Sequence, residues 1–118
     1  QKQETIVFKV GTSTLTYESG KTNIRRLEER GLIQASVRLR DALAANLQRE
    51  PYCREPAQLL GPAPAPVARV NYSYRYQLTL VCRNTAPIRR LLAFVLAEFS
   101  KDRQNRGLTA LIDINSYN

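Results

Sequence analysis

Residues 74–83, YRYQLTLVCR, alternate between two kinds of side chain over ten positions. Successive side chains of a β-strand point to opposite faces of its sheet, so the pattern predicts a strand that is buried on one side only. The apolar series comprises Tyr74, Tyr76, Leu78, Leu80 and Cys82; the other comprises Arg75, Gln77, Thr79, Val81 and Arg83. The sheet that contains this strand must bury one face and leave the other open to solvent.

Shorter segments predict the remaining strands of this sheet. Residues 5–10, TIVFKV, place Ile6, Phe8 and Val10 on one side. Residues 108–114, LTALIDI, show the same alternation after the turn residues NRG. Two brief apolar stretches, 58–60 and 67–70, predict short strands, and Asn71, Tyr72 and Ser73 predict a hairpin turn between the second of these and residues 74–83.

Two segments have the spacing of amphipathic helices. Leu39, Leu43 and Leu47 recur every four residues, which predicts a helix over 32–50 that Gly31 precedes and Pro51 ends. A second helix is expected to begin at Asn84 or Thr85 as N-cap, with Pro87 in its first turn. Its apolar stripe contains Ile88, Leu91, Leu92, Val95, Leu96 and Phe99.

The order of these elements is strand, helix, strand, strand, helix, strand. This order is typical of the two-layer split β-α-β arrangement, also called ferredoxin-like. The sequence therefore predicts an α+β fold in which two helices cover one face of a four-stranded antiparallel sheet. With 118 residues, we expect a single domain over 1–118.

Three prolines, Pro62, Pro64 and Pro66, alternate with alanines directly after Gly61. Proline fixes φ near −65° and disfavours the helical region for the preceding residue, so the segment is expected to be a stiff extended rod. It either stiffens a loop between two short strands or supports the following hairpin so that the hairpin faces a ligand.

The charge of the chain is +8, and 14 of its 18 basic residues are arginine. No acidic residue occurs between Pro56 and Ala97, although five arginines do. Arginine forms bidentate contacts with phosphate oxygens and stacks on bases, so the distribution favours a nucleic-acid partner over a solvated basic face without one.

The chain contains Cys53 and Cys82 but no histidine, which predicts two reduced thiols and no metal site or cofactor. It has no apolar run long enough to cross a bilayer, so we expect a soluble, cytoplasmic protein without a membrane partner. Because Gln1 opens a chain without methionine, we expect it to be a fragment of something longer.

Residues 60–81, LGPAPAPVARVNYSYRYQLTLV, and 111–117, LIDINSY, carry a family resemblance. Together they are similar to the carboxy-terminal domain of the bacterial primosomal replication-restart helicases (PriA). The resemblance covers residues 31–118 and implies a small α+β module that binds forked or single-stranded DNA. It also implies a surface that helps engage single-stranded-DNA-binding protein and other primosome proteins. The phosphate loop and metal motif of the helicase are absent from the chain, so we expect no ATP hydrolysis and no catalytic residue.

The arginines and one tyrosine of this region are the candidate DNA contacts. We expect the arginines to bind phosphates and Tyr72, in the predicted turn, to stack on an unpaired base. Tyr74 and Tyr76 share the apolar side of their strand, which makes them candidates for the core rather than for stacking. The set of candidate contacts is Arg69, Tyr72, Arg75, Arg83, Arg89 and Arg90.

Residues 6–28 carry a different resemblance. IVFKVGTSTLTYESGKTNIRRLE is similar to the opening of glutamate 5-kinase, an amino-acid kinase. The resemblance implies an alternative function, a vestigial nucleotide-phosphate site at Lys9, Gly11, Thr12 and Ser13. We therefore expect a hybrid chain in which a leader, 1–30, supplies the first strand for a helicase-like body, 31–118.

Overall fold

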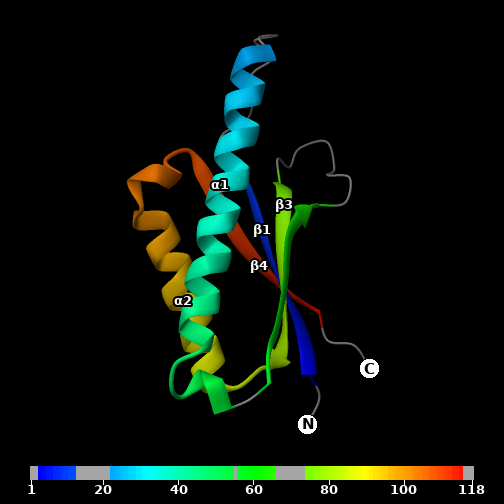
Figure 1. The fold of residues 1–118 in the computed structure, drawn as a ribbon, viewed down its shortest axis with the longest axis vertical. Helices are drawn as coiled ribbons and strands as arrows, with labels where there is room; N and C mark the ends of the chain where they lie inside the picture. The colour runs from blue at the N-terminus through cyan, green and yellow to red at the C-terminus, as the bar shows by residue number, and fades with distance from the viewer. Residues whose placement is uncertain (1–2, 13–21, 55, 66–73, 116–118) are drawn as a thin grey trace.

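The computed structural model describes residues 3–12, 22–54, 56–65 and 74–115. They form two layers, a four-stranded antiparallel sheet and two helices that cover one of its faces (Figure 1). The strand order is β2-β3-β1-β4, which confirms the predicted split β-α-β arrangement. In chain order the elements are β1 (Gln3–Thr12), α1 (Thr22–Leu47), the 3-10 helix η1 (Tyr52–Arg54), β2 (Gln58–Pro64), β3 (Tyr74–Arg83), α2 (Ala86–Lys101), the 3-10 helix η2 (Arg103–Asn105) and β4 (Leu108–Asn115).

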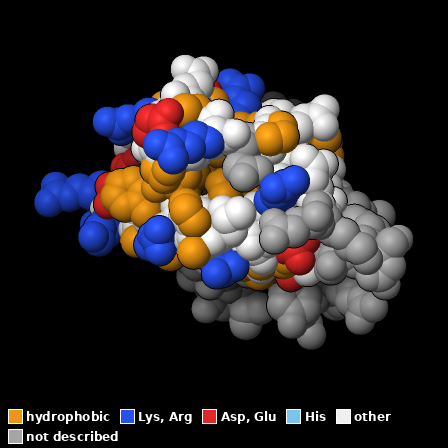
Figure 2. All heavy atoms as spheres, turned by 90° about the horizontal axis from the view of Figure 1, so that it is seen from below, with side chains coloured by type: hydrophobic (Ala, Val, Ile, Leu, Met, Phe, Trp, Pro, Cys, Tyr) orange, Lys and Arg blue, Asp and Glu red, His pale blue; other side chains and the backbone are white. Residues whose placement is uncertain are grey.

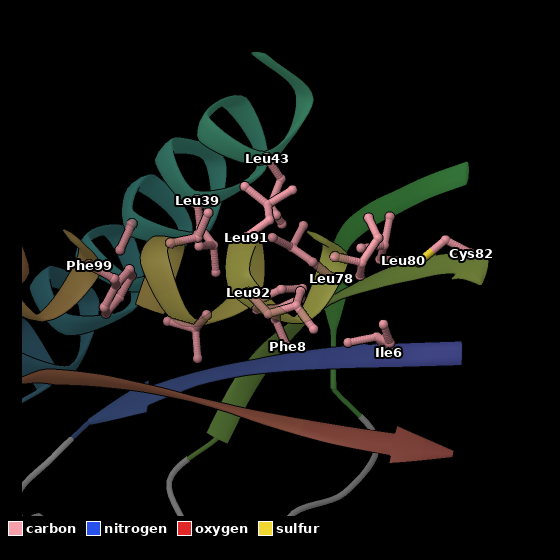
Figure 3. Packing of buried hydrophobic residues seen from close by; sticks show 14 of the residues in the cluster. Ile6, Phe8, Leu39, Leu43, Leu78, Leu80, Cys82, Leu91, Leu92 and Phe99 are labelled. Atoms are coloured by element: carbon pink, nitrogen blue, oxygen red, sulfur yellow. The ribbon is translucent and has the colours of Figure 1, made fainter. Parts of the chain in front are cut away.

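The two central strands, β1 and β3, supply the middle of the core. Ile6 pairs with Leu80 and Phe8 with Leu78, and all four side chains are fully buried beneath the helices. Figure 3 shows these residues between the sheet and the two helices, together with Leu39 and Leu43 of α1. The alternation of residues 74–83 thus gives the buried and open faces that the sequence predicts.

Helix α1 is longer at its start than the sequence predicts. It was expected over 32–50 but runs from Thr22 to Leu47, so Gly31 lies inside it. A glycine in a helix interior costs only about 1 kcal/mol relative to alanine, which the packing of the helix can offset. The helix also ends three residues before the predicted end, and the chain turns at Gln48–Glu50 ahead of Pro51.

Helix α2 begins as predicted. Thr85 is its N-cap, and the side chain of Thr85 accepts a hydrogen bond of 3.4 Å from the backbone N–H of Ile88. Pro87 lies in the first turn, where its missing N–H has no helical partner to lose. The stripe facing the sheet is buried, with Leu91, Val95 and Phe99 each at most 6% exposed.

The proline segment differs from the predicted rod. Residues 61–64 belong to β2, which extends from the predicted 58–60 to Pro64 and forms an edge of the sheet. A bulge between Leu60 and Ala63 interrupts its pairing with β3. Every N–H of an inner strand donates to one of its two neighbouring strands, and proline has no N–H. An edge strand with a bulge therefore tolerates proline. The predicted strand 67–70 and turn 71–73 lie outside the described residues.

Both cysteines are free thiols, Cys53 exposed and Cys82 buried in the core. In the described ranges, neither helix is long and apolar enough to span a membrane.

Candidate nucleic-acid interface

Strand β3 separates two of the predicted DNA contacts. Arg75 lies near its beginning and Arg83 at its end, and both belong to the face opposite the helices. Eight residues of an extended strand span about 27 Å, so the two guanidinium groups occupy opposite ends of the sheet. Arg75 is exposed and Arg83 half-buried.

Three of the predicted arginines lie near one another along the chain, where β3 ends and α2 begins. Only Asn84 and Thr85 separate Arg83 from the helix, and Arg89 and Arg90 lie exposed in its first turns. Nη1 of Arg89 donates a hydrogen bond of 3.1 Å to the backbone oxygen of Asn84. This acceptor is neutral, so the positive charge of Arg89 is held in place without being cancelled. We call Arg83, Arg89 and Arg90 the arginine cluster.

The arginine cluster lies at the lower end of the molecule in the view of Figure 1. Figure 2 looks at this end and shows several lysine and arginine side chains with few acidic ones among them. No acidic residue occurs in the first turn of α2, and its backbone N–H groups carry the positive end of the helix dipole. Basic side chains therefore outnumber acidic ones at this end, although Glu4 lies opposite Cys82 in the neighbouring strand.

The open face of the sheet is less basic than the alternation alone suggests. Lys9 Nζ lies 2.8 Å from a carboxylate oxygen of Asp113, so these charges compensate each other. Val7, between Thr79 and Asp113 in neighbouring strands, is only 8% exposed on this face. The open face is thus a mixed apolar and polar surface, with arginines at two of its ends.

Three of the four residues of the alternative phosphate site, Lys9, Gly11 and Thr12, lie within the sheet. The first strand was predicted over residues 5–10, and β1 extends beyond it to Thr12, so that Gly11 and Thr12 pair with Thr109 and Leu108. Gly11 is buried, and Lys9 is engaged by Asp113. Ser13 lies outside the described residues, as do Arg69 and Tyr72 of the DNA set.

A cleft of about 240 Å³ between α1 and α2 was not predicted. Its apolar lining includes Leu39 and Phe94, and its charged lining consists of two acidic residues, Glu98 and Asp102, and one basic residue, Arg38. Carboxylates repel phosphates, so this cleft does not extend the interface formed by the arginine cluster. The spacing of apolar residues along the two helices could not reveal this cleft, because the cleft depends on how far apart the helices pack.

Comparison with known proteins places the chain in a family. Residues 24–117 match the family of the primosomal protein N C-terminal domain. The replication restart protein PriA of Bacillus subtilis (strain 168) is 28% identical over 65 residues, which is 55% of this chain and 8% of that protein. The chain therefore spans a small part of the length of that relative. The likeness of residues 6–28 to glutamate 5-kinase finds no support in these comparisons. Because the matched residues make up most of its length, the chain belongs to the family of primosomal protein N C-terminal domains.

Proposed function

We propose that this chain is a non-catalytic DNA-binding module of a replication-restart helicase, and that it binds forked or single-stranded DNA through its arginines. The observation that carries the proposal is the arginine cluster. Arg89 and Arg90 are exposed, and neither forms an ion pair with another residue in the part of the chain that the structure describes. Their charges are therefore available to phosphate oxygens.

The arrangement fits contacts to a phosphate backbone rather than to base edges. The arginines of α2 are on one turn of a rigid helix, and the adjoining backbone N–H groups favour anions. Phosphate contacts of this type position a protein on DNA without reading sequence. Affinity should then depend on DNA structure and on salt, with little dependence on sequence.

Arg75 belongs to the other end of the proposed interface, and we include with it the candidate contacts Arg69 and Tyr72. Arg75 is exposed at the start of β3, and the two others precede it along the chain. We propose that they engage a second segment of the DNA, with Tyr72 stacked on an unpaired base. Substitution Tyr72→Ala should weaken binding of single-stranded DNA about tenfold, since a stacked base contributes about 1–3 kcal/mol.

The membership of the family supports a role in replication restart and hence contacts with other primosome proteins, including single-stranded-DNA-binding protein. The acidic cleft between α1 and α2 and the arginine cluster lie on different parts of the module. Protein docking and DNA binding could therefore take place on separate surfaces.

The test is fluorescence anisotropy with labelled single-stranded and forked DNA over a salt series. Binding should weaken steeply as salt increases, because each phosphate contact releases counterions. The double variant Arg89→Ala, Arg90→Ala should bind at least tenfold more weakly than the unchanged chain and show a shallower salt dependence.

A matched control separates the arginine cluster from net charge. The double variant Arg103→Ala, Arg106→Ala removes the same charge from exposed arginines beyond the other end of α2. It should lose little affinity. Equal losses in both double variants, or binding that is indifferent to salt, would contradict the proposed interface.

A further inference from the structure

Strand β4 is an edge of the sheet. In the described part of the chain its one strand neighbour is β1, with which it pairs without a register shift from Thr12–Leu108 to Thr5–Asn115. Figure 3 shows β4 beyond β1, on the side of the sheet away from β3. The backbone N–H and C=O groups on the outer side of an edge strand lack a ladder partner, so they can pair with another strand.

The two edges of the sheet differ in how they are protected. The opposite edge, β2, contains Pro62 and Pro64 and a bulge, all of which hinder the addition of a strand. β4, with the sequence LTALIDIN, contains no proline, lysine, arginine or glycine. Its single charged residue, Asp113, is paired with Lys9 of the same sheet. β4 therefore lacks the features that usually prevent edge-to-edge association.

One apolar side chain of β4 remains largely in contact with solvent. Ile114 is 46% exposed, although it belongs to the helix-facing series of the strand. A strand added at this edge would bring a neighbouring side chain over Ile114. The exposed isoleucine and the open backbone edge thus occur in the same place.

We propose that β4 pairs antiparallel with β4 of a second copy of this chain. Antiparallel pairing about a two-fold axis perpendicular to the sheet keeps the helices of both copies on one side. The two four-stranded sheets would then form one continuous sheet. Successive side chains of a strand alternate between the two faces of the sheet. Only registers that set helix-facing residues of one copy opposite helix-facing residues of the other therefore preserve the core.

A register centred on Leu111 satisfies this condition. It places Leu111 opposite Leu111 of the second copy on the open face. On the helix-facing side it sets Ile112 opposite Ala110 and Ile114 opposite Leu108. Each Ile114 is then covered by an apolar side chain. Thr109 faces Asp113 of the second copy, so its hydroxyl can donate a hydrogen bond to that carboxylate.

The charges near the two ends of β4 favour the same orientation. Arg106 lies exposed just before the strand, and Asp113 lies near its end. Antiparallel pairing brings the arginine end of one copy toward the aspartate end of the other, whereas parallel pairing would bring like ends together.

Sedimentation equilibrium in the absence of DNA tests the proposal independently of the proposed function. The apparent mass should rise with concentration from 13.4 kDa toward twice that value. Ile114→Lys should shift the equilibrium at least tenfold toward the monomer. The matched control is Ile33→Lys, which places the same charge at a 41% exposed isoleucine of α1 and should leave the equilibrium unchanged. A monomer at every concentration, or equal shifts in both variants, would overturn the proposal.

Cysteine crosslinking tests the register. In a Cys53→Ser background, Leu111→Cys places two thiols opposite each other, with Cβ atoms about 5 Å apart, and should form a disulfide-linked dimer on oxidation. Thr109→Cys is the control, because its two copies would lie four residues apart, about 14 Å along the strands. Crosslinking at position 109 but not at 111 would overturn the register. Hydrogen exchange of the backbone amides is a second measurement. If the protein is a monomer and the amides of β4 exchange as slowly as those of β1, the edge is covered within one chain and the proposed dimer is overturned.

Discussion

Lys9 and Asp113 form an ion pair across β1 and β4 on the face of the sheet that the helices leave open, with 2.8 Å between Nζ and the carboxylate oxygen. The pair is diagonal, since Lys9 is directly opposite Leu111 and Asp113 is opposite Val7. The two side chains are 36% and 50% exposed. Water therefore screens the pair, and its main consequence is to remove a free positive charge from the middle of the open face.

Substitution Asp113→Asn should leave the fold nearly as stable as before. An exposed ion pair contributes about 0–1 kcal/mol, so the free energy of unfolding should fall by less than about 1 kcal/mol. Urea unfolding at low and at high salt is the measurement, and the small loss should shrink as salt screens the pair. A loss of more than about 2 kcal/mol would mean that this pair is a major support of the sheet.

Gly61 should not tolerate a side chain. Its φ is +101°, and a Cβ at this position would lie 2.9 Å from the backbone oxygen of Gln77 in β3. Gly61 lies in the bulge of β2 and the Gln77 oxygen in the paired backbone of β3, so the clash can be relieved only by disturbing the bulge or the strand pairing. We expect Gly61→Ala to lower the free energy of unfolding by about 1–3 kcal/mol, measured by urea unfolding. Unchanged stability would show that the edge strand readily adopts another path.

Gly31 provides the opposite case. It lies inside α1, and a Cβ added there would meet no atom within 4 Å. Alanine is the better helix former, so Gly31→Ala should raise the free energy of unfolding by about 0.5–1 kcal/mol. Thermal unfolding followed by circular dichroism measures the change. A decrease would contradict the continuous helix from Thr22 to Leu47.

The elements that the sequence predicts best are those whose partners are close to them in the chain. The ten-residue alternation of β3 needs only its own pattern, and the start of α2 is fixed by Thr85 and Pro87. Helix α1 was predicted too short because a glycine was read as a break. Whether one glycine ends a helix depends on the packing of the whole helix, which a local pattern does not contain.

The parts of the candidate site that were missed depend on contacts between distant residues. Nothing in the alternation of either strand indicates that Lys9 meets Asp113. The cleft between the helices and the separation of Arg75 from the arginine cluster likewise depend on the packed fold. The number and region of the basic residues could be predicted, but their compensation by acidic groups could not.

Asn105 connects three elements through its buried side chain. It is 5% exposed; its amide nitrogen donates a hydrogen bond of 3.0 Å to the backbone oxygen of Phe99, and its amide oxygen accepts one from Arg38. Substitution Asn105→Ala removes both hydrogen bonds and leaves the Phe99 oxygen with only a long bond of 3.4 Å from the backbone N–H of Asp102. We expect a loss of about 1–3 kcal/mol in the free energy of unfolding. Gln104→Ala, at the exposed neighbouring position, should change it by less than about 0.5 kcal/mol. Equal effects at both positions would argue against the connection.

The thiol of Cys82 should make stability depend on pH in the alkaline range. Burial raises the pKa of Cys82 from 9.0 to about 11, and the negative charge of Glu4 contributes in the same direction. Because the pKa of the folded state is the higher one, the unfolded chain loses this proton first. The stabilisation is complete below the unfolded pKa and is lost as the pH rises through the pKa of the folded state.

Comparison with Cys82→Val isolates this effect, since all other titratable groups are the same in both proteins. The free energy of unfolding of the unchanged chain, relative to that of the variant, should fall by about 1 kcal/mol between about pH 8 and pH 10, because each pKa unit corresponds to about 1.4 kcal/mol. Urea unfolding under reducing conditions at several pH values measures the difference. If the difference stayed constant over this range, the Cys82 thiol would have the same pKa in the folded protein and in the unfolded chain. A thiol with that pKa could not lie in the apolar layer between β3 and the helices.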